Sequence, residues 1–417
     1  MFRSKLLKIF AALILLGVLG IVVYQIPAVN NRLFWRVQVA EAYVRGVIYP
    51  ADQMPTPVVS VVKITPTPTL APTPTATEPP GITPTVTATL VPTPTLAPLP
   101  SSIKLDPPTY ELEDINNCGP ATLTMYLRYY GWEGDQFSIN KVIKPERADR
   151  NVNVDELAYY VKNFAGWLNV EYRVGGDLDT LKHLLAAGIP VMIEETFKMD
   201  KSYWPNDDLW AGHYLLLTGY NDDNKVFISQ DAFYGANRLI TYSDLDKQWQ
   251  SFNRVYIMVF KADQTDTIKT ILGDNWDVDK NRQHALDVAK AETQTTPQNA
   301  YSWFNLGSNL VYFERYDEAA QAYDTARDIG LPQRMLRYQF GPFIAYFNTN
   351  RIDDMMALVT YALERTPNSE EALLWKGWGL YRQGDKNGAV ENFRKALEVN
   401  PGYQDALYAL NYLGVQP

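Results

Sequence analysis

Residues 51–100 are the longest stretch of this 417-residue chain that cannot fold into a compact domain. They include 13 prolines and 13 threonines, in repeats such as Thr65-Pro66-Thr67-Pro68. Proline at this density favours extended polyproline-type backbone, and large apolar side chains are too few for a core. We therefore predict a disordered Pro/Thr-rich stalk at 51–100, open to O-glycosylation if it lies outside a cell, with separate folded parts around it.

A long apolar segment lies near the start of the sequence. Between Lys8 and Arg32 there are 23 uncharged residues, and residues 9–24 are almost all apolar. At about 1.5 Å per residue, a helix of this length can cross a hydrocarbon core of about 30 Å. We predict a cytoplasmic tip and transmembrane helix at 1–31, which contacts the membrane through residues 9–26, and a juxtamembrane segment at 32–50.

A cleaved signal peptide is the alternative interpretation of the apolar segment. No small-x-small cleavage site follows it directly, which favours an anchor. Basic residues before it, Arg3, Lys5 and Lys8, favour a cytoplasmic N-terminus. We expect a single-pass protein of the cell membrane whose folded domains are extracytoplasmic.

Charge and composition exclude several classes of function. Residues 101–264 contain 16 basic and 24 acidic residues, and the whole chain has a net charge of −9 without a basic tract, which excludes nucleic acid as a partner. A single cysteine excludes intramolecular disulfides and multi-thiolate metal sites. With three histidines and no Gly-rich phosphate loop, we expect neither a metal nor an organic cofactor.

Residues 101–264 show helical patterns first and strand patterns afterwards. Apolar residues recur at helical spacing in 121–130, 154–164 and 177–187. The strand-like runs that follow are 190–194, 214–220, 225–230 and 255–260. This order predicts an α+β domain with antiparallel strands.

Residues 265–417 contain an internal repeat of helices. Small and aromatic residues recur at a distance of 70: Gly307, Ala319, Tyr323 and Ala326 correspond to Gly377, Ala389, Phe393 and Ala396. The implied units of 34 to 36 residues, at 300–335, 336–369 and 370–403, resemble tetratricopeptide repeats, with a closing helix at 404–414. We predict an all-α solenoid that binds a protein partner or an extended peptide. A nonrepetitive helical bundle is the alternative.

The only cysteine, Cys118, lies where a helix is expected to begin. Pro120 suits a first helical turn, and the apolar residues Leu123, Tyr126 and Leu127 follow at helical spacing. Unpaired N–H groups and the helix dipole stabilise a thiolate at such a position. A small buried hydrophobe is the alternative role for a lone cysteine.

A partner for this thiol is predicted on a β-hairpin. His213 opens a strand, and a second strand returns from the polar turn at 221–224 to end at Asp231. A hairpin centred on this turn places His213 and Asp231 on neighbouring strands. The carboxylate could then orient the imidazole, whose other nitrogen would face the thiol.

Several motifs in residues 105–262 resemble the papain-like cysteine peptidase superfamily, specifically stand-alone relatives of the bacteriocin-leader-processing peptidases. They are Asn-Asn-Cys-Gly-Pro-Ala-Thr-Leu at 116–123, Gly-Gly-Asp-Leu-Asp-x-Leu-Lys at 175–182, Ala-Gly-Ile-Pro-Val at 187–191, Gly-His-Tyr at 212–214 and Gly-Tyr-Asn-Asp at 219–222. The resemblance implies that Cys118 is the nucleophile, His213 the general base and then acid, and Asp231 the residue that orients His213.

One position departs from that family. Its members carry a glutamine five or six residues before the nucleophile, whose amide donates to the oxyanion, whereas this chain has Glu113 and Leu112. An ionised carboxylate cannot donate a hydrogen bond. Either Glu113 is protonated, or Asn116 or Asn117 substitutes, or backbone N–H groups suffice, or activity has been lost.

Two classes of function follow from the sequence. The first is a thiol hydrolase that acts on a peptide or protein substrate. The second is a catalytically impaired domain that serves as a peptide- or protein-binding module. Transglutaminase-like or amidase chemistry would use the same three residues. Processing of double-glycine leaders is disfavoured because no exporter helices follow the domain.

Overall fold

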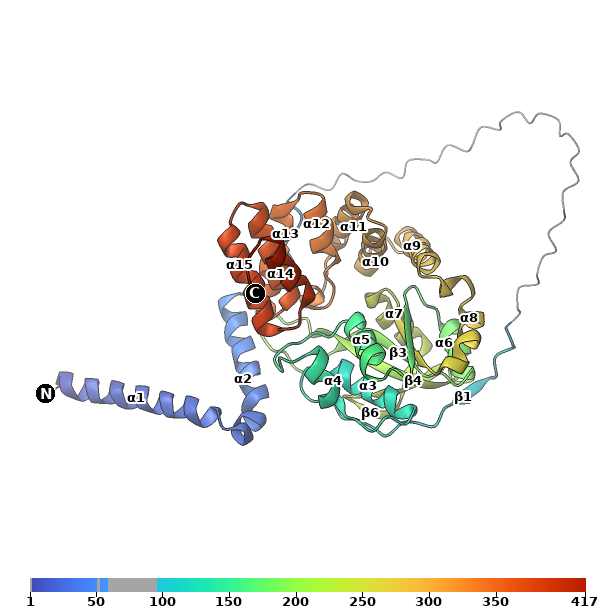
Figure 1. The fold of residues 1–417 in the computed structure, drawn as a ribbon, viewed down its shortest axis with the longest axis horizontal. Helices are drawn as coiled ribbons and strands as arrows, with labels where there is room; N and C mark the ends of the chain where they lie inside the picture. The colour runs from blue at the N-terminus through green and yellow to red at the C-terminus, as the bar shows by residue number, and fades with distance from the viewer. Residues whose placement is uncertain (1, 51–52, 59–95) are drawn as a thin grey trace, which may run out of the picture.

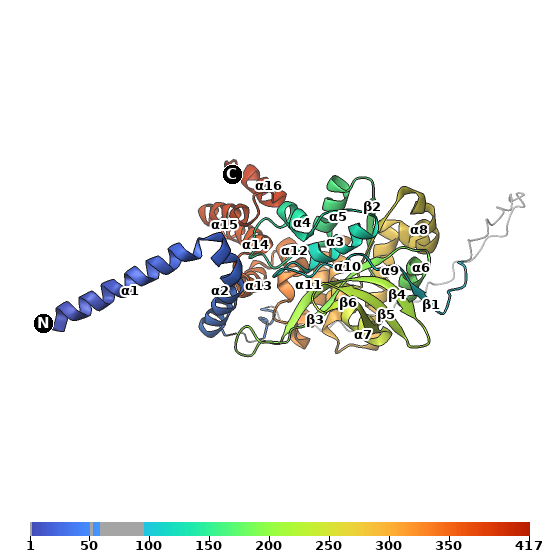
Figure 2. The same ribbon diagram turned by 90° about the horizontal axis from the view of Figure 1, so that it is seen from below.

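The computed structural model describes residues 2–50, 53–58 and 96–417 (Figures 1 and 2). The predicted stalk therefore lies mostly outside the described residues. Residues 101–264 contain a seven-stranded antiparallel sheet in the order β2-β7-β3-β4-β5-β6, with β1 paired to β4. Its strands are β1 Ser102–Lys104, β2 Asn169–Arg173, β3 Val191–Lys198, β4 Trp210–Asn221, β5 Val226–Asp231, β6 Gly235–Thr241 and β7 Tyr256–Phe260.

Helices cover both faces of this sheet. Their bounds are α3 Cys118–Tyr129, α4 Gln136–Ile143, α5 Val154–Phe164, α6 Leu178–Ala186, α7 Tyr242–Trp249 and α8 Thr265–Leu272. Alternate residues of β4 enter two cores: Tyr214 and Leu216 pack with α3 and α5, and Leu215 and Leu217 pack with α6 and α7. The predicted α+β class is confirmed, although α4, α7, β2 and β6 were not anticipated. Their short runs carry weaker apolar periodicity than the strands that were predicted.

The C-terminal region consists of stacked helix pairs. These are α10 Ala300–Tyr312 with α11 Tyr316–Ile329, α12 Gly341–Asn348 with α13 Ile352–Arg365, and α14 Glu370–Arg382 with α15 Lys386–Val399, flanked by α9 Val278–Thr295 and α16 Gln404–Tyr412. The recurring glycines have one packing role. A Cβ on Gly307 would lie 2.7 Å from the ring of Tyr323, and one on Gly377 would lie 2.4 Å from Phe393. The repeat thus preserves a close helix crossing against an aromatic ring.

The helix pairs form an arc along one side of the sheet domain (Figure 1). Polar side chains join the two parts: the amide of Asn253 donates to Asn309 at 2.9 Å, and that of Asn305 donates to the carbonyl of Gln250 at 2.8 Å. Further along the arc, the guanidinium of Arg334 pairs with Asp207 at 2.6 Å. Part of the surface of the repeats is therefore in contact with the chain's own sheet domain.

Two helices precede the described end of the stalk, α1 Phe2–Tyr24 and α2 Pro27–Ile48. Within the described residues, no helix combines the length and the hydropathy that a membrane crossing requires, so the predicted span is not confirmed. Residues 32–50, which we predicted as a juxtamembrane segment, lie mostly in α2, which packs close to α13. Beyond it, Met54 is only 3% exposed and belongs to the core of the repeats. The segment around Met54, which we predicted as part of the disordered stalk, is therefore packed against the repeats through this apolar side chain.

Candidate active site

Cys118 is the first residue of α3, as the sequence predicts. Asn117 precedes it with φ −120°, so the chain turns into the helix at this point, and Pro120 lies in the first turn. The helix is held firmly because Leu123, Tyr126 and Leu127 are completely buried. The N–H groups of a first helical turn have no acceptor within the helix, so they favour negative charge on the Cys118 sulfur.

His213 and Asp231 are brought together on adjacent strands. Nε2 of His213 lies 2.9 Å from Oδ1 of Asp231. The predicted neighbourhood is confirmed, but a hairpin centred on 221–224 would place Asp231 almost directly opposite His213, and this register is not observed. Asp231 pairs with Leu215, because the turn lies one residue later, with Asn221 opposite Val226. Residues two apart on a strand share a face, so the two side chains still meet diagonally.

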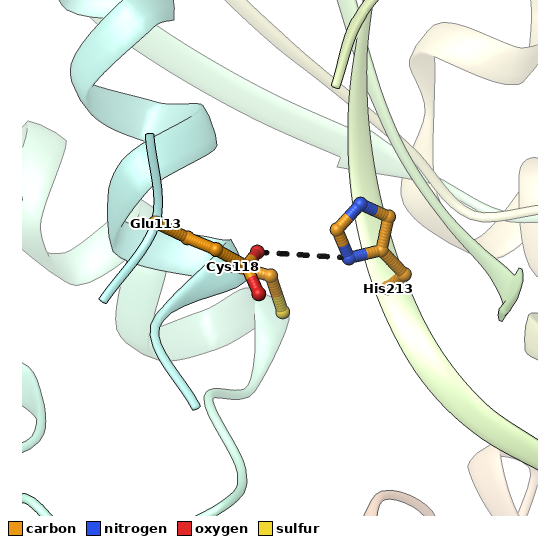
Figure 3. Close-up of side chains that lie close together, drawn as sticks. All are labelled: Glu113, Cys118 and His213. Atoms are coloured by element: carbon orange, nitrogen blue, oxygen red, sulfur yellow. Dashed lines mark ion pairs between the residues drawn. The ribbon is translucent and has the colours of Figure 1, made fainter. Parts of the chain in front are cut away.

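The other ring nitrogen of His213 faces two side chains from the segment before and at the start of α3. Nδ1 lies 3.9 Å from Oε2 of Glu113. Ligand atoms of Glu113, Cys118 and His213 all lie within 4.8 Å of one another (Figure 3). The imidazole thus bridges the thiol and Asp231, which is the geometry required of a base with its orienting carboxylate.

The pKa of His213 is controlled by opposing effects. Burial lowers this pKa, but hydrogen bonds with Asp231 and Cys118 and the negative charge of Glu113 outweigh burial and raise it well above 6.5. Burial alone would raise the pKa of Asp231, but His213 and the backbone N–H groups of Tyr234 and Phe233 lower it below 3.8. The environment therefore favours a charged imidazolium next to an ionised Asp231.

Three candidates for oxyanion binding behave differently. The amide of Asn117 is 1% exposed and donates to Oε1 of Gln136 at 2.7 Å, so the structure removes it as a donor to substrate. Asn116 has φ +56° and lines the cleft, and its Nδ2 is buried without a partner among the described residues. Glu113 occupies the position of the expected glutamine, and its Oε2 is likewise buried without a hydrogen-bond partner among the described residues.

Burial is the main reason that the pKa of Glu113 is raised above 4.5. His213 and Lys144 lower this pKa, whereas Asp231 raises it. A protonated Glu113 has an O–H that can donate a hydrogen bond, as a glutamine amide does. Near Cys118 the structure therefore leaves the amide of Asn116 as a side-chain donor, and Glu113 becomes a second donor only in its protonated form.

Several residues of the site were not found from sequence. Gln136 accepts from Asn117 and from the N–H of Asp114, both at 2.7 Å, and so fixes the segment before Cys118. Lys144 also holds this segment in place, because its Nζ donates to the carbonyl of Asn116 at 2.5 Å. Glu195 lies opposite His213 on β3, and burial raises its pKa to about 8. The pairing of β3 with β4 was the only feature that could have pointed to Glu195. No sequence pattern pointed to Gln136 or Lys144.

The site opens into a cleft of about 620 Å³. One wall belongs to the sheet domain, a second to α2 through Trp35 and Gln38, and a third to the repeats through Arg334, Arg337 and Tyr338. Three separate parts of the sequence therefore enclose the thiol.

Within the described residues, Glu113, Cys118 and His213 are the group whose side chains could together hold a metal ion. Each offers one ligand atom of a kind that Zn²⁺ accepts. The composition argument against a metal cage considered cysteines and histidines alone, and it overlooked a mixed set of this kind.

The fold and the site together are those of a C39-like, papain-fold peptidase domain. Residues 104–257 match the model of the Peptidase_C39 like family, and residues 370–403 match a tetratricopeptide repeat. The chain thus carries a C39-like peptidase domain followed by a helical repeat region, as the sequence motifs predicted. None of the curated proteins matches the sequence.

Solved structures similar to each part are only distantly related. A putative C39-like peptidase from Bacillus anthracis is 15% identical, with 38% of this chain and 98% of that chain covered and a TM-score of 0.31. Xylellain, a cysteine protease from Xylella fastidiosa, is 14% identical, with coverages of 40% and 88% and a TM-score of 0.30. YrrB, a tetratricopeptide-repeat protein with an unusual peptide-binding site, is 17% identical, with coverages of 31% and 84% and a TM-score of 0.19.

Proposed function

We propose that this protein is a cysteine peptidase that hydrolyses a peptide or protein substrate through Cys118, His213 and Asp231. The observation that carries the proposal is the arrangement of His213, whose Nε2 lies 2.9 Å from Asp231 while its Nδ1 side faces Cys118. The match of residues 104–257 to a peptidase family supports the same reaction class.

The reaction begins with the Cys118 thiolate, which attacks the carbonyl carbon of the scissile amide. The Nδ1 proton of His213 passes to the departing amine as the C–N bond breaks, and the acyl group stays on the sulfur. Neutral His213 then takes a proton from water, the resulting hydroxide attacks the thioester, and the acid product leaves. Asp231 holds the ring in one orientation and stabilises its charged form.

Glu113 has a specific role in this proposal. Its protonated carboxyl group donates to the developing oxyanion, together with the amide of Asn116 and the backbone N–H of Cys118. The raised pKa of Glu113 supports this assignment, as does its buried Oε2, which has no hydrogen-bond partner among the described residues. Hydrolysis therefore requires the protonated form of Glu113.

The test is trapping of a covalent acyl-enzyme with a thiol-directed acyl probe, followed by intact mass measurement of the full-length protein. Wild type should gain one acyl group, and Cys118→Ala should gain none. Arg394→Gln, on the exposed surface of α15, is the matched control and should behave as wild type. Equal labelling of wild type and Cys118→Ala would sink the proposal.

A binding module without catalysis is the second candidate function, favoured by Glu113 in place of the expected glutamine. A carboxylate there would oppose the charge of an oxyanion. The acyl-enzyme measurement separates the two functions when it is followed over time, because a peptidase hydrolyses its thioester and regenerates free Cys118, whereas a pure binding module does not turn the adduct over.

We further propose attachment of the chain to a membrane, with the folded domains on the extracytoplasmic side. The apolar side chains of α1 support attachment, since Phe10, Leu15 and Ile21 are each more than 60% exposed. Protease added to intact cells should remove residues 101–417, and protection of these residues until lysis would contradict the orientation. The repeats are proposed to bind a protein partner, on the surfaces that the peptidase domain leaves uncovered.

A further inference from the structure

The cleft next to Cys118 contains four arginines, and they fall into two pairs. Arg147 is bound to Asp114 at 2.9 Å, and Arg334 is bound to Asp207 at 2.6 Å. Arg150 and Arg337 line the same cleft. Among the residues that the structure describes, no carboxylate forms an ion pair with either of these two.

Arg150 belongs to the peptidase domain and lines the same space as the thiol. It lines a narrow space together with Cys118, Asn116 and Tyr338. Its Nη2 donates at 3.2 Å to Oε1 of Gln38, a neutral group on α2. Burial, and then the positive charges of Arg337 and Arg334, lower the pKa of Arg150 to about 9. A cation in such surroundings gains free energy when an anion binds.

Arg337 reaches the same cleft from the repeats. It is 7% exposed, and its Nε donates to Oγ1 of Thr366 at 2.9 Å. Its Nη2 is buried and has no hydrogen-bond partner within the described part of the chain. A buried N–H group of a cation that lacks an acceptor is costly, and a ligand oxygen would remove that cost.

We propose that Arg150 and Arg337 form a subsite for a carboxylate group of the substrate, next to the bond that Cys118 attacks. The planar guanidinium groups are suited to carboxylate oxygens, which they bind through parallel N–H groups. The carboxylate is supplied either by an acidic side chain or by the C-terminus of a peptide. The proposal rests on the peptidase function and deepens it, because it specifies that the substrate carries a negatively charged carboxylate group.

Two small alkylating reagents test the subsite without any need for hydrolysis. Iodoacetate and iodoacetamide both react when the thiolate attacks their CH₂ group and iodide leaves, but only iodoacetate carries a carboxylate. Because Cys118 is the only cysteine, every alkyl group found by mass is on this residue. The ratio of the two rates in the folded full-length protein is compared with the ratio for the same protein unfolded in urea.

The folded wild type should have a ratio of iodoacetate to iodoacetamide rates at least about tenfold above that of the unfolded chain. Arg150→Gln should lose most of this preference, Arg337→Gln should lose part of it, and Arg150→Lys should retain more than Arg150→Gln. Arg394→Gln is the control and keeps the wild-type ratio. Equal ratios in the folded and unfolded protein would overturn the subsite.

Peptides then identify the source of the carboxylate. Internally quenched libraries are prepared with Glu or Gln fixed at one position, and with a free or an amidated C-terminus. Arginine-dependent preference for Glu assigns an acidic side chain, and the same preference for the free terminus assigns a C-terminal carboxylate. Equal cleavage of all libraries overturns the subsite but supports hydrolysis. No cleavage, with the alkylation preference retained, supports the subsite and contradicts the peptidase function.

Discussion

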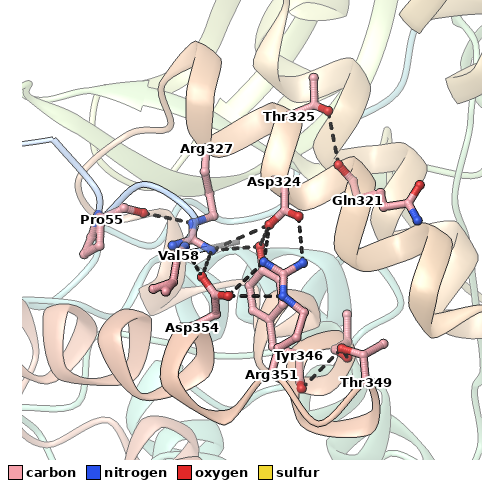
Figure 4. Close-up of polar contacts among 11 residues, drawn as sticks. Pro55, Val58, Gln321, Asp324, Thr325, Arg327, Tyr346, Thr349, Arg351 and Asp354 are labelled. Atoms are coloured by element: carbon pink, nitrogen blue, oxygen red, sulfur yellow. Dashed lines mark hydrogen bonds and ion pairs between the residues drawn. The ribbon is translucent and has the colours of Figure 1, made fainter. Parts of the chain in front are cut away.

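Two buried clusters of charge in this molecule differ in their balance. Between α11 and α13, Arg327 and Arg351 face Asp324 and Asp354, so two cations meet two anions (Figure 4). Nη1 of Arg327 lies 3.1 Å from Oδ1 of Asp354, and Nη1 of Arg351 lies 2.7 Å from Oδ2 of Asp324. In the cleft, by contrast, Arg150 and Arg337 have no carboxylate partner among the described residues, and Oε2 of Glu113 has no hydrogen-bond partner there.

The balanced cluster also holds the segment 53–58, which follows α2, in place. Nε of Arg327 donates to the carbonyl of Pro55 at 2.9 Å, and the N–H of Val58 donates to Oδ1 of Asp354 at 3.0 Å (Figure 4). Nη2 of Arg327 is also buried without a hydrogen-bond partner among the described residues, so the two clusters differ in their ion pairs. Charges that are compensated by opposite charges serve the architecture, whereas cations without a counter-ion are poised for an anionic ligand. The comparison thus separates a structural use of charge from a functional one.

The largest effect is expected at His213, in the cleft. His213→Gln removes the group that takes and returns a proton, so we expect kcat/KM for peptide cleavage to fall by about 10³-fold. Circular dichroism provides the control for folding. A variant that keeps more than a tenth of wild-type activity would show that His213 is not the base.

The balanced cluster predicts a large effect on stability instead. Arg327→Ala leaves two carboxylates with a single cation, so we expect the free energy of unfolding to fall by about 3 kcal/mol. Arg337→Met removes a buried cation that has no counter-ion, and should change stability by less than about 1 kcal/mol. Urea unfolding followed by circular dichroism measures both. Equal losses in the two variants would break the distinction between the clusters.

Glu113 gives a pH-dependent test of the same distinction. The wild type needs protonated Glu113 as a donor, so its kcat/KM should fall as pH rises through the raised pKa of this carboxyl. Glu113→Gln supplies a neutral donor at every pH. At alkaline pH we therefore expect the variant to be about tenfold more active than wild type. A variant whose pH profile matches that of wild type would exclude Glu113 as the oxyanion donor.

The sequence predicted the core of the site but not its surroundings. Cys118 was found because Pro120 marks a helix start. His213 was found because a strand pattern follows it, although β4 begins three residues earlier, at Trp210. A hairpin centred on the turn at 221–224 gave Asp231 as a neighbour of His213. It missed the irregular pairing near Gly219, because the side chains at a bulge do not reveal it. These signals are local, as are the glycines that reveal the repeats.

The parts of the cleft that could not be predicted depend on docking. Arg150 and Arg337 are 187 residues apart in the sequence, and they meet only because the repeats pack against the sheet domain. Helix α2, expected as a simple juxtamembrane segment, completes the cleft for the same reason. No local pattern records such contacts between separate parts of a chain, because each residue's own propensity is compatible with many partners.

The smallest expected effect concerns the contact between α2 and the cleft. Gln38 is a neutral acceptor for Arg150 at 3.2 Å, so it competes with a substrate carboxylate for the same guanidinium. Gln38→Ala frees that N–H and should raise the ratio of iodoacetate to iodoacetamide rates at Cys118 severalfold, by about two- to fivefold. Gln38→Glu should lower the ratio, because it supplies Arg150 with an internal carboxylate and makes this part of the cleft resemble the balanced cluster. If both substitutions shift the ratio in one direction, α2 affects access to Cys118 and does not compete for Arg150.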